Sequence, residues 1–196
     1  MQRIMIITLA LVLAVTGVSA ETTWKLDNVH SAVKFSVTHM VIAEVPGSFR
    51  DFDVTFVQKG SADFAGSSLN ATIKTASVNT DNDGRDKHLR SDDFFNAEKF
   101  PVITFKSTAF EKTGTDTYAI KGDLTIRDIT KPVVLTARYT GTVKDPWGNT
   151  KIGFKATTAI SRFEFGLKWN KAVEAGGLVV GETVDIMLLM EFAQAK

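Results

Sequence analysis

The stretch YAIKGDLTIRDITKPVVLTARY, from Tyr118 to Tyr139, alternates apolar and polar side chains in two successive segments. Apolar residues recur at a spacing of two, at Tyr118, Ile120, Leu124 and Ile126 and then at Val133, Leu135, Ala137 and Tyr139. Successive side chains of a β-strand point to opposite faces of the sheet, whereas a helix repeats every 3.6 residues or so. The stretch therefore predicts two strands, each with one face in a core and one face in water.

The same period of two extends along most of the chain. It recurs at Val33, Phe35 and Val37, at Leu69, Ala71 and Ile73, and at Ile152, Phe154 and Ala156. Short turn signals such as Pro46-Gly47 and Asp145-Pro146-Trp147-Gly148-Asn149 separate these segments. About eight strands joined mostly by short turns favour a single all-β domain, an antiparallel barrel or sandwich.

Residues 1–20, MQRIMIITLALVLAVTGVSA, have a different character. Arg3 precedes an apolar run from Ile4 to Val15, and small residues follow it up to Ala20. This pattern predicts a secretory signal peptide that is cleaved after Ala20, which leaves a domain of residues 21–196 in the periplasm. A spanning helix would need about 20 apolar residues, and Thr16-Gly17 ends the run earlier.

Charge and cysteine content exclude several kinds of function. Cleavage would remove Arg3 and no acidic residue, so the net charge of the remaining chain is 0 rather than +1. Binding to nucleic-acid phosphate requires a clear cationic excess, so we expect no nucleic-acid partner. The chain has no cysteine, which excludes disulfides, thiolate metal sites and cysteine nucleophiles.

The segment DGRDKHLRSDDFF, from Asp83 to Phe95, lacks the period of two. The pairs Asp83–Lys87 and Asp86–Arg90 place an acid four residues before a base, which is the favourable order on a helix. Asn82 or Asp83 can cap the start of that helix. An apolar face for docking is supplied by Leu89, Phe94 and Phe95, and Pro101 precedes the next strand. We expect a short helical lid over one end of a barrel.

The histidines offer an enzymatic and a metal-binding alternative. His88 with Asp86, Asp92 or Asp93 would form an acid–base pair, but no nucleophile motif such as Gly-x-Ser-x-Gly accompanies it. A metal site would recruit His30, His39 and His88, whose spacing matches no metal-binding motif. We therefore expect no catalysis, no metal and no cofactor, and keep the His88/Asp86 enzyme as an alternative.

The segment from Val184 to Phe192 is apolar on both faces. Val184, Ile186 and Leu188 lie in phase on one face, while Met187 and Leu189 make the opposite face apolar as well. Either a helix or loop covers that outer face, or the face forms a homodimer contact. The periodicity does not decide between the two.

Several segments together resemble the YceI-like family of polyisoprenoid-binding, lipocalin-like periplasmic proteins. The matching stretches are WKLDNVHSAVKFSVTHM (24–40), PGSFRDFDVTF (46–56), SVNTDNDGRDKHLRSDDFFNAEKFPVITFKST (77–108), GDLTIRDITKPVVL (122–135) and SRFEFGLKW (161–169). The pattern RD-x-HL-x-S-x-DFF followed by FP-x-ITF is specific, and so is G-x-LTI followed by TKPV. Asp128 departs from the family, which often carries glycine in that turn, and this leaves the local turn conformation open.

The resemblance implies an extended eight-stranded antiparallel barrel that holds one long apolar ligand. Such a ligand would be a polyprenyl chain, an isoprenoid quinone or a fatty-acyl amide, and the family also tends to dimerise. We expect the apolar tunnel to be lined by Val33, Phe35, Val37, Ile103, Phe105, Phe154 and Phe165. The 14 phenylalanines could instead fill the interior, which would leave a filled-barrel interaction domain.

Candidate head-group contacts follow from strand phase. His39 is in phase with Val37, and Arg162 is in phase with Ile160 before Phe163 and Phe165 switch phase. An inward arginine must be paired, with a carboxylate or a ligand head group, unless a bulge turns it outward.

If the helix is a lid, Arg85 and His88 would line the mouth of the tunnel and join the head-group contacts. The expected head-group set is therefore His39, Arg85, His88 and Arg162. The expected function is to bind, transport or sequester a long-chain amphiphilic lipid in the periplasm. Transient contact with a membrane or a membrane enzyme is a further expectation.

Overall fold

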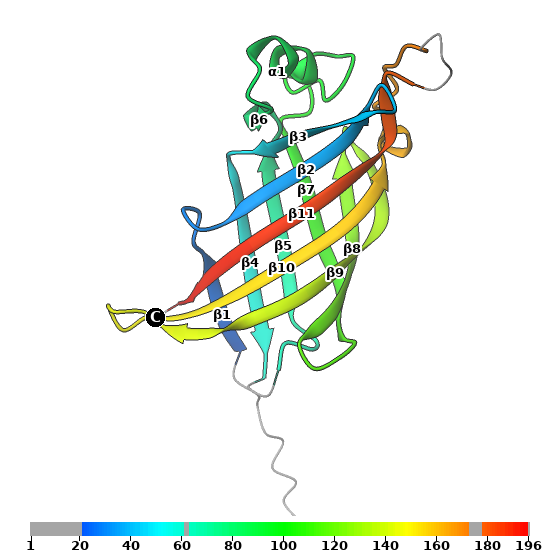
Figure 1. Ribbon diagram of the computed structural model, residues 1–196. Coiled ribbons are helices and arrows are strands. Elements are labelled where there is room, and N and C mark those ends of the chain that lie inside the picture. Colours follow the sequence, from blue (N-terminus) through cyan, green and yellow to red (C-terminus); the bar gives the residue numbers. More distant parts are fainter. Residues whose placement is uncertain (1–20, 61–62, 173–177, 196) are drawn as a thin grey trace, which may run out of the picture.

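The computed structural model describes residues 21–60, 63–172 and 178–195, so the predicted signal peptide, residues 1–20, lies outside the described residues. Eight antiparallel strands close into a barrel (Figure 1). They are β1 (Glu21–Leu26), β4 (Phe52–Lys59), β5 (Ser68–Lys74), β7 (Val102–Lys112), β8 (Thr117–Ile126), β9 (Ile129–Lys144), β10 (Thr150–Ser161) and β11 (Val180–Gln194). β1 pairs with both β4 and β11, which closes the ring and confirms the predicted barrel.

Three further strands extend one side of the barrel. They are β2 (Ala32–His39), β3 (Ala43–Phe49) and β6 (Val78–Asn79). The long strand β11 pairs with β1 near its C-terminal end and with β2 nearer its N-terminal end, so the wall is taller on this side. In Figure 1, β2 and β3 lie toward the end of the barrel that carries α1.

The burial of side chains follows the predicted period of two. On β4, buried and more exposed residues alternate from Phe52 to Lys59, with Val54 and Phe56 directed inward. β8 alternates in the same way, with Ile120, Leu124 and Ile126 buried. Amphipathic strands of this kind place one continuous core inside the barrel.

The helix α1 (Asp83–Arg90) is confirmed, but the predicted ion pairs are wrong. Asn82 caps it, because its side chain accepts a hydrogen bond of 2.9 Å from the Arg85 amide. Asp86 turns into the protein, where it accepts from the Thr80 amide and hydroxyl instead of pairing with Arg90. A buried carboxylate gains more from backbone and hydroxyl donors than from an exposed partner four residues away.

The half of the barrel farther from α1 is filled by aromatic rings. We call this group the aromatic floor; its members are Phe56, Phe64, Phe110, Tyr118, Tyr139, Phe154 and Phe192. The Phe56 ring lies 5.7 Å from that of Phe110 and 5.4 Å from that of Phe192, centre to centre. The expectation of an interior filled by phenylalanine therefore holds for this half of the barrel alone.

Met187, on the outer face of β11, is 38% exposed. A groove beside it crosses the outer face of β9, β10 and β11, with Val134, Thr157 and Ala159 among its lining residues. Among the described residues, no helix or loop covers Met187, so the covering segment expected there is not found. A homodimer contact stays a prediction. Within the same ranges, no helix is long and apolar enough to cross a membrane.

Candidate functional site

An apolar cavity of about 200 Å³ lies between the aromatic floor and α1. Four floor rings, those of Phe56, Phe110, Phe154 and Phe192, form its lower wall. The upper wall comes from the cap, which is α1 together with the segment that follows it (residues 83–95). The cap residues that line the cavity are Leu89, Phe94 and Phe95. The surface that this cavity presents is apolar throughout.

All the residues expected to line a tunnel line this cavity. They are Val33, Phe35, Val37, Ile103, Phe105, Phe154 and Phe165. Strand phase placed those on β2 and β7, whereas Phe154 follows a register shift in β10 and Phe165 lies in a 3-10 helix. Contact between these residues and a ligand stays a prediction.

Two glycines shape the cavity wall. The sequence analysis missed Gly122 and assigned Gly47 to a turn between strands, whereas Gly47 lies inside β3. Phe35 pairs directly with Gly47 on β3, and a Cβ added to Gly47 would come within 2.3 Å of the Phe35 ring. The Phe105 ring stands over Gly122 on β8 in the same way, at 2.4 Å. Glycine inside a strand often marks such a close approach, and this signal could have identified both positions.

Arg162 points inward as its phase predicted, and its side chain lines the cavity. The residue is only 4% exposed, and among the described residues its side chain donates to backbone carbonyls rather than to a carboxylate. Nε donates to the Gly181 carbonyl at 2.8 Å, Nη2 donates to the Val180 carbonyl at 3.0 Å, and Nη1 donates to the Leu167 and Trp169 carbonyls. Burial lowers the pKa of Arg162, and the nearby Glu182 carboxylate opposes that effect. Carbonyl dipoles therefore stabilise this buried cation.

The loss of strand phase after Arg162 has a local cause. Residues Arg162–Phe165 form the 3-10 helix η2, so Phe163 and Phe165 no longer follow the alternation of β10. Gly166 ends η2 in the left-handed conformation, with a φ of 77°. The bonds from Arg162 tie this turn to the start of β11. No bulge turns the arginine outward.

The other three head-group candidates lie off the cavity wall. Arg85 donates to the Thr80 hydroxyl at 2.8 Å and to the Thr80 carbonyl at 2.7 Å, which fixes α1 to the segment after β6. His39 ends β2, where it pairs with Ala43. His88 is half-buried on α1 and does not line the cavity. The structure thus brings Arg162 alone of the four to the wall, and ligand contacts by the others stay predictions.

The partner of His88 is Asp93, at 2.8 Å from Nε2, rather than Asp86 or Asp92. The imidazole also packs edge-on against the rings of Phe94 and Trp169, each with a centre-to-centre distance of 5.0 Å. Trp169 belongs to the rim segment (residues 162–171), which borders the open end of the barrel. His88 therefore joins the cap to the rim.

Arg127 provides a second attachment for the cap. Its Nη1 donates to the carbonyls of Phe94 and Gly166, at 2.8 and 3.2 Å. Arg127 and Asp128 form the turn between β8 and β9 and have φ values of 52° and 60°. This turn, which the sequence analysis left open at Asp128, is therefore left-handed at both positions.

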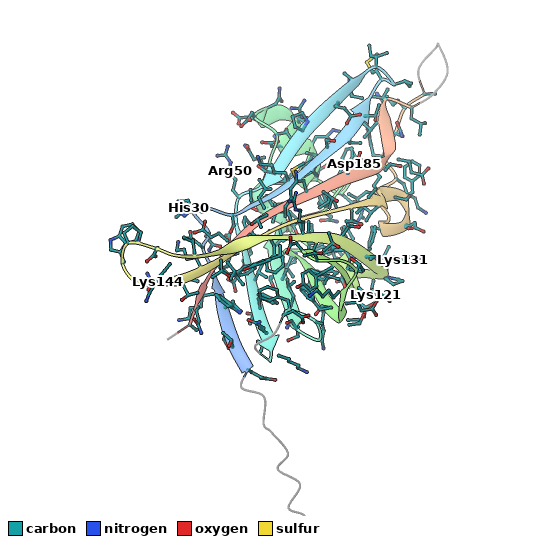
Figure 2. The ribbon with its side chains drawn as sticks, turned by 60° about the horizontal axis from the view of Figure 1, so that its bottom comes forward. His30, Arg50, Lys121, Lys131, Lys144 and Asp185 are labelled. Atoms are coloured by element: carbon teal, nitrogen blue, oxygen red, sulfur yellow. The ribbon has the colours of Figure 1, made fainter. Side chains whose placement is uncertain are left out.

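The three histidines lie on separate elements. His30 belongs to the β1–β2 turn, on one side of the barrel (Figure 2). There the Asp27, His30 and Glu191 side chains come together. The Lys151 ammonium bridges the two carboxylates at 2.7 Å from each.

We call Asp27, Lys151 and Glu191 the ion-pair clasp. The bond from Lys151 holds the pKa of the Asp27 carboxyl well below its usual range, and bonds to both carboxylates raise the pKa of Lys151 above its usual range. The clasp joins residues that are 124 and 40 positions apart in sequence, so sequence reasoning did not anticipate it. The Lys151 ammonium already bonds to both carboxylates that a metal ion would use.

Comparisons with known proteins agree with this architecture. The family model of the YceI-like domain matches residues 24–192. The chain is similar to the UPF0312 protein of Azotobacter vinelandii, with 42% identity over 139 residues that cover 71% of this chain and 72% of that protein.

Two solved structures share the fold. The first is BcnA of Burkholderia cenocepacia, with a TM-score of 0.74 and 22% identity, covering 85% of this chain and 98% of that one. The second is a polyisoprenoid binding domain from Saccharophagus degradans, with a TM-score of 0.62 and 17% identity, covering 88% of this chain and 98% of that one.

Proposed function

Because the chain belongs to the YceI-like domain family, we propose that it is a periplasmic carrier that binds the apolar chain of a lipid inside its barrel. The observation that carries the proposal is the cavity of about 200 Å³ with a wholly apolar surface, enclosed between the aromatic floor and the cap. The Saccharophagus degradans neighbour, a polyisoprenoid binding domain, supports a ligand of this class. The predicted signal peptide supports the compartment.

The size of the cavity suggests how much of a chain it accepts. At about 30 Å³ of liquid volume per water molecule, a cavity of about 200 Å³ would hold about seven waters. A methylene group displaces a volume similar to that of water, so a segment of comparable carbon count fits. Each buried methylene contributes about 0.8 kcal/mol, against which the ordering of the chain must be set. A chain of some 40 carbons would require the cap or the floor to move.

A polar head group would lie near Arg162. The guanidinium carries five N–H donors, and its bonds to four backbone carbonyls leave one donor at Nη2, which a head group reaches only after a small shift of the apolar wall that covers it. We place the head group there, with His39, Arg85 and His88 as further contacts near the rim. The proposal includes no metal and no cofactor, and it includes no chemical step because the acid–base candidate His88 does not line the cavity.

Blocking the cavity tests the proposal. Ala156 lines the cavity, whereas Ala159 on the same strand faces out. Purified Ala156→Phe protein should lose the lipid that organic solvent extracts from the wild type, as measured by mass spectrometry. Ala159→Phe should keep it. Wild-type protein without any extractable lipid would overturn the carrier proposal. Turnover of a bound lipid that is lost in His88→Ala would favour the enzyme instead.

We also propose a homodimer through the outer face of β11. The exposed Met187 and the adjacent groove support it, because apolar outer faces of strands are typically covered. Sedimentation of the wild type and of Met187→Lys tests this contact. A wild-type monomer at micromolar concentration would remove it.

A further inference from the structure

The turn between β2 and β3 exposes three consecutive apolar residues. Met40, Val41 and Ile42 are 46%, 62% and 88% exposed. Leu178, which precedes β11, is another exposed apolar residue near them. We call these four residues the apolar tip. Clusters of exposed apolar side chains of this kind mark sites that meet an apolar partner.

The backbone of the apolar tip is strained as well as exposed. Met40 and Val41 have φ values of 50° and 67°, and the Ile42 amide donates to the His39 carbonyl at 3.2 Å. A turn with two central residues of positive φ favours Asn-Gly, and a β-branched residue such as valine is among the least suited. The side chains of Met40 and Val41 are both exposed, so the described core of the barrel does not depend on them. Strain that folding does not need is typical of functional segments.

The apolar tip lies at the end of the barrel that carries the cap and the cavity. The Met40 amide donates to the Val179 carbonyl at 2.8 Å, and the Val179 amide donates to the Lys171 carbonyl at 2.9 Å. Lys171 belongs to the rim segment, whose Trp169 packs against the cap. In Figure 1 the β2–β3 turn and α1 lie at the same end of the barrel. The tip is therefore connected through backbone bonds to the segment that holds the cap in place.

We propose that the apolar tip inserts into the surface of a lipid bilayer and turns the cap end of the barrel toward it. This inference rests on the proposed function, because it names the surface through which a lipid carrier meets its source. A stable protein interface buries about 800 Å² on each partner, and a narrow convex turn cannot supply such an area. A bilayer needs no matching surface and accepts a few apolar side chains at its boundary.

The charges around the apolar tip fit an anionic bilayer. Lys168 and Lys171, both exposed, lie on the adjacent rim segment, where they can meet phosphate head groups. Glu44 is the nearest acid along β3, but its carboxylate accepts from the hydroxyls of Thr38 and Ser36, at 2.7 and 3.1 Å. Its charge is therefore directed along the outer face of β2 rather than toward the bilayer.

A second exposed turn provides an internal control. Trp147, in the turn between β9 and β10, is 82% exposed. This turn lies at the floor end, since β10 leads from it to Phe154, and a bilayer bound there would face away from the cap. Lys144, which precedes the turn, projects from one side of the barrel in Figure 2.

The test is flotation of the full mature chain with vesicles of phosphatidylethanolamine and phosphatidylglycerol. Met40→Asn with Val41→Gly should raise the thermal stability, because it relieves the strain, and should lower vesicle binding by at least about tenfold. Trp147→Asp should bind vesicles as the wild type does. The opposite directions of stability and binding exclude a merely structural role for the turn.

The outcomes separate this inference from the carrier proposal. A wild type that does not float, a double variant that floats equally well, or a loss of binding in Trp147→Asp would each overturn the inference. So would a double variant that loses a dimer instead of vesicle binding. Chain that floats but contains no extractable lipid would remove the carrier function and leave the bilayer contact standing.

Discussion

The Phe105 ring stands over Gly122 on the neighbouring strand, and a Cβ added to this glycine would lie 2.6 Å from the Lys106 carbonyl oxygen as well as 2.4 Å from the ring. The ring can move toward the cavity, but the carbonyl belongs to a paired strand and cannot. The wall of the cavity therefore depends on the absence of a side chain at Gly122.

Gly122→Ala should destabilise the protein by about 1–3 kcal/mol, as overpacking of a core does, and should push the Phe105 ring into the cavity. Urea unfolding measures the first effect and lipid occupancy the second. Gly84→Ala on α1 is the matched control, because its Cβ would meet nothing closer than 3.5 Å. There we expect a gain of up to about 1 kcal/mol from helix propensity. Equal effects at both sites would contradict the wall model.

The left-handed turn at Arg127 and Asp128 predicts a stabilising substitution. Asp128→Gly should raise stability by about 1 kcal/mol, because glycine adopts a φ of 60° without a steric penalty. Arg127→Gly relieves similar strain but also removes the bonds to the Phe94 and Gly166 carbonyls. The backbone amides of the cap should therefore exchange hydrogen faster in Arg127→Gly than in Asp128→Gly. Identical exchange in the two variants would show that Arg127 does not hold the cap.

The ion-pair clasp predicts a pH-dependent stability. The pKa of Asp27 is lowered from 3.8, so its contribution is present above that pH and is lost as the pH falls below it. The pKa of Lys151 is raised from 10.5, so its contribution is present below that pH and is lost as the pH rises above it. The melting-temperature deficit of Lys151→Met should therefore be largest between these two values and should shrink in acid. Lys155→Met, an exposed change on the same strand, should show no such profile.

The aromatic floor sets the depth of the cavity. Phe56 is fully buried, and Phe56→Ala should cost about 3–5 kcal/mol through the void that it leaves. The same void lengthens the cavity, so any lipid extracted from this variant should be longer than that from the wild type. Phe56→Leu should lose less stability and shift the length less. An unchanged length distribution in Phe56→Ala would place the lipid elsewhere.

The sequence was informative wherever the strands are regular. The phase of Val33, Phe35 and Val37 predicted their inward positions, and that of Ile160 predicted the inward Arg162, because alternation survives as long as pairing is regular. The short helix and its Asn82 cap followed from local spacing. These features depend on residues that are close in sequence.

Contacts between distant segments were not accessible in this way. The carbonyls that satisfy Arg162 come from the rim segment and β11, and nothing in the composition of those segments indicates that their backbone would serve as acceptors. The clasp around Lys151 depends in the same way on strand register. Met40 and Val41 adopt positive φ values that their residue types disfavour. Asp86 bonds to Thr80 instead of to the helical partner that its spacing predicted. Each is set by tertiary structure.

The aromatic floor makes the barrel a pouch with a blind end. A lipid chain that binds in such a pouch must enter tail first and leave head first, so binding and release follow the same path in opposite directions. A pouch with a single opening does not by itself favour binding over release. For the proposed carrier, the direction of transfer is then set by the relative abundance of free lipid on either side, so a single unaltered fold can serve as donor at one time and as acceptor at another.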